Sequence, residues 1–210
     1  MTTCPLCSER PAKRFCPAKD TKICAVCCGT KREIEIDCPS SCSYLKASRS
    51  YEYEKPIPDP QLAAKANQFG PDFVAQHHVL LDLVTLTIVE ERMSSAWLVD
   101  HDVIEVLKAL KETLRTLSSG IYYEALPEGP IRQALFRRLK EILDRLMQVD
   151  PAAEHPVLKV SEAMDVLDFL TFVAEANSSV RPKSRRYLDW ITERYAERMQ
   201  AQQPSGLIIP

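Results

Sequence analysis

All eight cysteines of this 210-residue chain lie within its first 42 residues, and none follows. Such clustering indicates one compact cysteine-rich structural unit. The opening residues MTTCPLCSER lack the apolar segment of an export signal, so we expect a soluble protein in the reducing cytoplasm. There a disulfide framework would not persist, whereas thiolates bound to a metal would. The cysteine pattern therefore favours metal binding.

The cysteine spacing suits zinc. Cys4/Cys7 and Cys24/Cys27 are two Cys-x2-Cys pairs, a spacing that lets two thiolates reach one Zn²⁺ from a single tight turn. Zn²⁺ prefers four tetrahedral ligands. The remaining cysteines bring the set to eight, enough for two zinc ions: Cys16, Cys28, Cys38 and Cys42.

The stretch CAVCCGT, residues 24–30, contains the adjacent thiols Cys27 and Cys28, whose side chains leave the backbone in different directions. If the two Cys-x2-Cys pairs share one ion, the loop between them carries Cys16 away to other partners. Cys27 then faces one ion and Cys28 the other, and Gly29 is expected to let the chain turn sharply away. The order of the cysteines thus predicts two interleaved sites.

The segments CPLC and RFCPAKDTKICAVC, followed by paired ligands at 38 and 42, resemble a B-box type zinc finger, a RING-like cross-brace, and more loosely the MYND and HIT fingers. The resemblance covers residues 4–42 only. It implies that the first and third ligand pairs bind one zinc ion and the second and fourth bind another. It also implies a role in protein–protein interaction. Carried over by position, the first site is Cys4, Cys7, Cys24 and Cys27, and the second contains Cys16, Cys38 and Cys42.

The sequence departs from the B-box pattern at several ligand positions. Lys19 stands where a B-box usually has an acidic or cysteine ligand, with Asp20 one residue further on, and Cys38 and Cys42 replace the usual histidines. Cys28 has no B-box counterpart, although Cys24-x3-Cys28 matches MYND spacing. Cys28 is favoured as the fourth ligand of the second site, with Asp20 as the alternative. All-thiolate sets are usually closed to water, so the predicted zinc is structural.

Beyond the cysteines, apolar residues recur at three- and four-residue steps, typical of amphipathic helices, over 103–117, 131–146, 160–174 and 187–195. Residues 79–93 are apolar on nearly every side and are expected to form the central, most buried helix. The predicted fold is a small binuclear zinc finger, built from a short β-hairpin plus loops, followed by an all-α bundle of about five or six helices. The predicted parts are the finger with a trailing helical segment (1–55), a proline-rich linker (56–60), the bundle (61–203) and an apolar tail (204–210).

These features favour a non-enzymatic, zinc-binding adaptor that binds a protein partner, with the helical domain as scaffold. The chain has five glycines and lacks the phosphate-loop and nucleophile-elbow motifs, and every cysteine is assigned to zinc. A less favoured alternative is a nucleic-acid-binding regulator that uses the helix at 181–198 and basic residues of the finger: Arg10, Lys13, Arg14, Lys31 and Arg32. A helical-domain enzyme would instead need a pocket lined by His77, His78, Asp82 or Glu90.

Overall fold

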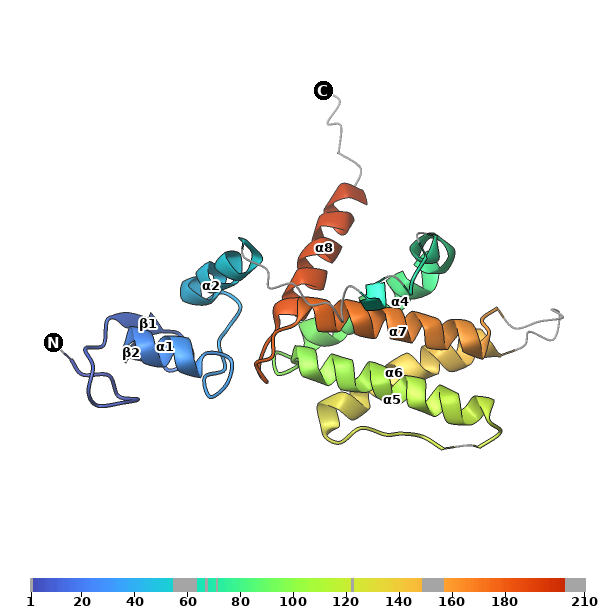
Figure 1. The fold of residues 1–210 in the computed structure, drawn as a ribbon, viewed down its shortest axis with the longest axis horizontal. Helices are drawn as coiled ribbons and strands as arrows, with labels where there is room; N and C mark the ends of the chain where they lie inside the picture. The colour runs from blue at the N-terminus through green and yellow to red at the C-terminus, as the bar shows by residue number, and fades with distance from the viewer. Residues whose placement is uncertain are drawn as a thin grey trace, which may run out of the picture.

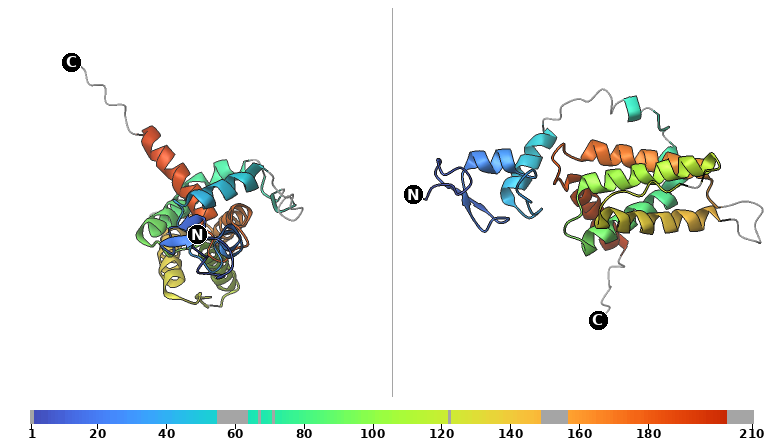
Figure 2. Two further views of the ribbon diagram at one scale, coloured as in Figure 1. Left: turned by 90° about the vertical axis from the view of Figure 1, so that its left-hand side faces the viewer. Right: turned by 90° about the horizontal axis from the view of Figure 1, so that it is seen from below.

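A computed structural model describes residues 2–54, 64–66, 68–70, 72–121, 123–148 and 157–202. The predicted linker at 56–60 and tail at 204–210 lie outside the described residues. Within them, a small cysteine-rich unit lies at one end of a helical bundle (Figures 1 and 2). We call residues 2–54 the finger.

The finger contains a two-stranded antiparallel hairpin, as predicted. Strand β1 (Arg14–Cys16) pairs with β2 (Thr21–Ile23), with Phe15 opposite Lys22. Alternation along β1 turns Phe15 to solvent and buries Cys16. Two helices follow, α1 (Ala25–Lys31) and α2 (Ser43–Glu54). Helix α2 is the trailing helical segment that we expected, whereas α1 replaces a predicted loop.

Five helices of the described chain form the bundle, and with the helices of the finger the helix count differs slightly from the prediction. Helices α5 and α7 each begin with a hydrogen bond from the N–H of the capping residue to a carboxylate three residues later. Asp102 accepts from Val99 at 3.2 Å, and Glu162 accepts from Lys159 at 3.0 Å. Helix α6 begins with Pro130 in its first turn, where the missing N–H of proline leaves no helical hydrogen bond unmade. The helices are α4 (Phe73–Ser94), α5 (Asp100–Ser118), α6 (Pro130–Met147), α7 (Val160–Asn177) and α8 (Arg186–Gln202).

The apolar stripes read from the sequence form a single core in the bundle. Helix α5 packs most extensively on α7 and then on α6, so these three make its centre (Figure 1). Fully buried members include Leu107, Phe136, Leu139 and Leu167. The cysteines and nearby aliphatic residues of the finger form a second, separate cluster.

Helix α4 is not the central helix that the sequence predicted. Its Val84, Ile88 and Val89 are fully buried, but Val79 is 68% exposed. In the described residues α4 packs on α6, α7 and α8, whereas the most extensive packing joins α5 to α7 and α6, so α4 lies beside the centre of the bundle rather than in it. By length and composition, α4 is the one helix in the searched part of the chain that could also cross a membrane.

Candidate metal centre

Two short backbone structures carry the four cysteines of the first predicted site. Cys4 and Cys7 lie on a tight turn in which the N–H groups of Cys7 and Ser8 donate to the carbonyl of Cys4, at 3.3 and 2.7 Å. Ser8 adopts a positive φ of 56°, which ends this turn. A bridge between Thr3 and Pro11 closes the loop around it. The turn therefore holds both thiols on the same side of the chain.

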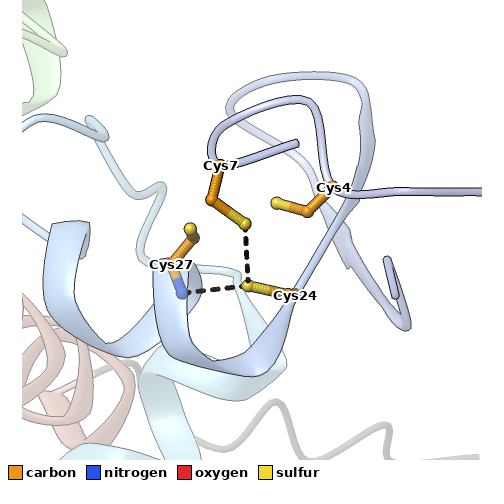
Figure 3. A group of neighbouring side chains, drawn as sticks. All are labelled: Cys4, Cys7, Cys24 and Cys27. Atoms are coloured by element: carbon orange, nitrogen blue, oxygen red, sulfur yellow. Dashed lines mark hydrogen bonds between the residues drawn. The ribbon is translucent and has the colours of Figure 1, made fainter. Parts of the chain in front are cut away.

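The second pair is placed by the start of α1. Cys24 precedes the helix in an extended conformation, and its Sγ accepts a hydrogen bond from the N–H of Cys27 at 3.3 Å. A sulfur in this position acts as a helix cap, as a serine or aspartate oxygen would. Cys27 lies in the first turn, so its thiol points to the same side as that of Cys24 (Figure 3).

The two pairs converge on one point. The four Sγ atoms of Cys4, Cys7, Cys24 and Cys27 all lie within 4.8 Å of one another, and those of Cys7 and Cys24 are 3.9 Å apart (Figure 3). A tetrahedral Zn²⁺ with Zn–S bonds of about 2.3 Å requires sulfur atoms about 3.8 Å apart. The donor set and its dimensions fit one such ion. Three of the four cysteines are also buried, with exposures of 4% or less.

The thiols of this group differ in acidity. Burial opposes ionisation of Cys4, but backbone N–H groups of Cys24, Leu6 and Cys7 lower its pKa to about 6. Burial raises the pKa of Cys27 to about 12, and hydrogen bonding to Cys24, Cys7 and Cys4 adds to the rise. With no cation present, the group thus favours sharing protons over four adjacent negative charges. A divalent cation would remove that repulsion and favour four thiolates.

Of the other four predicted ligands, three belong to or pack on the same small core, whereas Cys42 lies just before α2, where its carbonyl accepts from the N–H groups of Leu45 and Lys46. Cys16 is buried on β1, and Cys28 and Cys38 pack against the same cluster. Burial raises the pKa of Cys38, and the charges of Glu33, Cys42 and Cys16 act in the same direction. In the described part of the chain, Cys4, Cys7, Cys24 and Cys27 are the group whose ligand atoms meet within 4.8 Å.

The stretch CAVCCGT forms most of a helix. Cys28 lies one residue beyond Cys27 in α1, a rotation of about 100°, and Arg32 Nη2 approaches its Sγ at 3.8 Å. The adjacent thiols therefore diverge, as predicted. The expectation for Gly29 is wrong: it lies inside α1 rather than at a sharp turn, because the chain first changes direction at Arg32 and Glu33, where φ is 54°. Asp20, the alternative ligand, is exposed in the hairpin turn.

The two histidines considered for an enzyme site make local contacts on α4. His77 Nδ1 lies 3.0 Å from the carbonyl oxygen of Phe73, and its ring stacks on that side chain. His78 Nδ1 lies 2.9 Å from the carbonyl oxygen of Ala75, and Glu90 pairs with Arg138. A hollow of about 350 Å³ between α5 and α6 is lined instead by Leu110, Leu114, Leu117, Tyr123 and Met147, among others.

The basic residues considered for nucleic-acid binding mostly have partners within the chain. Lys31 pairs with Glu35, the guanidinium of Arg14 lies over the ring of Tyr44, and Arg32 is buried. At 181–198, Tyr187 is buried and Trp190 and Tyr195 pack on the core, so the aromatic residues form a packing stripe. Arg181, Lys183 and Arg185 all contact the finger.

Sequence reasoning missed the contacts that join the finger to the bundle. They involve acidic residues between the cysteines and basic residues just before α8, and their central residues are Glu33, Asp37, Arg49, Arg185 and Asp189. A signal was present, because KREIEID at 31–37 and RPKSRR at 181–186 have complementary charge. The spacing of about 150 residues gave no reason to pair them.

Comparison with known proteins gives no family for this chain: no family model matches it, and neither the curated proteins nor the solved structures contain a match. The likeness to a B-box therefore consists of cysteine spacing over residues 4–42. The geometry supports a narrower conclusion, that the chain has four cysteines close enough to bind one metal ion.

Proposed function

We propose that this chain is a non-enzymatic, zinc-binding adaptor of the cytoplasm, whose finger is a rigid recognition unit for a protein partner. The observation that carries the proposal is the convergence of Cys4, Cys7, Cys24 and Cys27 on a space suited to one ion. Four sulfur donors favour zinc over magnesium or calcium, which prefer oxygen ligands. They also fill the tetrahedron, so the metal would stabilise the finger rather than activate water.

A second zinc ion completes the proposal, held by Cys16, Cys28, Cys38 and Cys42. The burial of Cys16 and the packing of Cys28 and Cys38 on the same core support this set. The exposed position of Asp20 favours Cys28 as the fourth ligand. Closing this site requires the four thiols to move together as the metal binds, which is common where binding and folding are linked.

Zinc content tests the metal part of the proposal. Native mass spectrometry of the full chain, after reconstitution under reducing conditions, should show two zinc ions. Cys38→Ser should retain one, and Ser41→Ala, an exposed neighbour, should retain two. A wild-type chain with a single ion would remove the second site, and a chain with none would remove the proposed function.

The adaptor part is supported by the surface of the finger. Phe15, Val26 and Ile34 are 51%, 47% and 44% exposed, although the finger has few large apolar side chains to spare for its own core. Exposed apolar side chains on a rigid support are typical of binding surfaces. The helical bundle, with its own core, would serve as the scaffold.

A binding comparison tests the adaptor part. Full-length protein should capture a protein partner from its native extract, and Phe15→Ser together with Val26→Ser should abolish that capture while zinc content stays unchanged. Val79→Ser, which alters an exposed valine on α4, is the matched control and should bind normally. Capture lost with Val79→Ser but kept with the finger variant would place recognition on the bundle and contradict the proposal.

A further inference from the structure

The finger is held against the bundle by a continuous set of contacts, which we call the seam: residues 32–49 against residues 181–189. Part of it is backbone. The N–H of Lys183 donates to the carbonyl of Glu33 at 2.8 Å, and Arg181 Nη1 donates to the carbonyl of Arg32 at 3.1 Å. Lys183 Nζ reaches the carbonyl of Glu35 at 3.2 Å. The loop before α8 therefore binds backbone carbonyls of the finger directly after α1.

The seam also contains a chain of buried charges. Arg49 of α2 donates to Glu33 at 2.9 Å and to Asp189 of α8 at 2.7 Å, and all three side chains are 15% exposed or less. Ser40 Oγ donates to the other oxygen of Asp189 at 2.8 Å. A second pair joins Arg185 to Asp37 at 2.5 Å. Buried pairs of this kind depend strongly on geometry, because losing one partner leaves the other charge uncompensated.

The carbonyls that the bundle binds are positioned by α1. The carbonyl of Lys31, the last residue of α1, accepts from the N–H groups of Ile34, Glu35 and Ile36, which fixes the turn that presents Arg32 and Glu33. Helix α1 has seven residues, too few to be stable in isolation. Cys24 caps its start and Cys27 lies in its first turn, so a metal bound to both would hold the helix in place.

On the bundle side, the seam leads directly into the start of α8. Ser184 Oγ and the N–H groups of Tyr187 and Leu188 donate to the buried carboxylate of Asp100 on α5, at 2.8, 3.2 and 3.1 Å. The segment that contacts the finger is thus the same one that caps α8. The residues after α1 and the first turn of α8 are therefore joined through residues 181–184.

We infer that metal binding at Cys4, Cys7, Cys24 and Cys27 is thermodynamically linked to docking of the finger on the bundle. The inference rests on the proposed metal binding and adds a consequence for the bundle. Metal loss releases α1, withdraws the carbonyls of Arg32 and Glu33, and opens the seam at 181–189. Linkage is reciprocal, so an opened seam must weaken metal binding by the same factor. The presence or absence of metal in the finger would thereby change the contacts at the start of α8.

Reciprocity gives the test. In the full chain, Arg49→Ala should weaken zinc binding, measured by competition with a chromophoric chelator, by about fivefold or more, the lower end of typical couplings. Asp189→Asn is the second variant and should act in the same direction. Arg115→Ala removes an exposed ion pair on α5 far from the seam and should bind zinc as the wild type does.

Hydrogen exchange supplies the second readout. Removing zinc from the wild-type chain should speed amide exchange in residues 181–190 and leave residues 135–143 of α6 unchanged. Affinities within twofold of wild type in both seam variants, with exchange at 181–190 unaffected by zinc, would overturn the inference. A wild-type chain that binds no zinc would instead overturn the proposed function together with it.

Discussion

At the scale of single residues, Cys24 differs from the other cysteines of the first predicted site. Cys24 is both a sulfur donor and the cap of α1, because its Sγ accepts the N–H of Cys27. A serine oxygen could keep the cap but is a poor zinc ligand beside three thiolates. We therefore expect Cys24→Ser to lose one zinc ion per chain. Val26→Ala, two residues away and exposed, should keep both, and equal zinc in the two variants would contradict this assignment.

Asp100 is the residue on which the start of α8 depends. It is 1% exposed and accepts three hydrogen bonds from residues 184–188. Asp100→Ala leaves those donors without an acceptor in the protein interior, so we expect the free energy of unfolding to fall by about 2–4 kcal/mol in urea titrations. Asp168→Ala, which breaks a half-exposed pair with Lys111, should cost less than about 1 kcal/mol.

Asp100 also gives a pH dependence. Burial raises its pKa, and its hydrogen bonds to Leu188, Ser184 and Tyr187 only partly offset this. The folded protein therefore binds the proton of the Asp100 carboxyl group more tightly than the unfolded chain does, in which the pKa of aspartate is about 3.9. The stabilising contribution is full below that value and is lost as pH rises through the folded pKa. Urea unfolding should show wild type losing stability relative to Asp100→Asn above about pH 4; a constant difference between the two would contradict the prediction.

At the scale of elements, two glycines should respond to alanine in opposite ways. Gly129 precedes α6 with φ 93°, a conformation that strains any other residue, so Gly129→Ala should lower the stability of the protein by about 1–3 kcal/mol. Gly29 lies inside α1 with open space around it, so Gly29→Ala should favour the helix by about 0.5–1 kcal/mol. Thermal unfolding measures the effect of Gly129→Ala, and the rate of zinc transfer to a chelator measures the effect of Gly29→Ala. A destabilising Gly29→Ala would indicate that α1 is not helical when metal is bound.

The sequence predicted elements well where one signal dominated. Apolar residues at helical spacing predicted α5–α8. Helix α1 was missed because a seven-residue segment that contains two adjacent cysteines shows no apolar period. The position of α4 was misjudged because an apolar composition indicates that a helix can be buried, but not which neighbouring helices will cover it.

At the scale of the whole molecule, the finger and the bundle have separate apolar cores joined by a polar seam. Cys27→Ser should therefore unfold the finger yet leave most of the helical circular dichroism, since α4–α8 keep their core. Leu107→Ala, in that core, should instead lower bundle stability by about 2–5 kcal/mol. Loss of the entire helical signal in Cys27→Ser would contradict separate cores.

The relation between the two parts could not be predicted from the sequence. Residues that meet at the seam are about 150 positions apart, and charge complementarity between KREIEID and RPKSRR does not select them from the other charged segments. The four cysteines of the first site were predictable for the opposite reason. Each pair is local in sequence, and Cys-x2-Cys spacing lets two thiolates reach one ion from a single tight turn.

The central claim is that four thiolates from two short turns bind one zinc ion. X-ray absorption at the zinc edge of the reconstituted full chain tests it most directly. We predict a first shell of sulfur alone, with four neighbours at about 2.3 Å. A shell containing nitrogen or oxygen, or a purified chain that holds no zinc and carries its sulfurs as disulfides, would contradict the account.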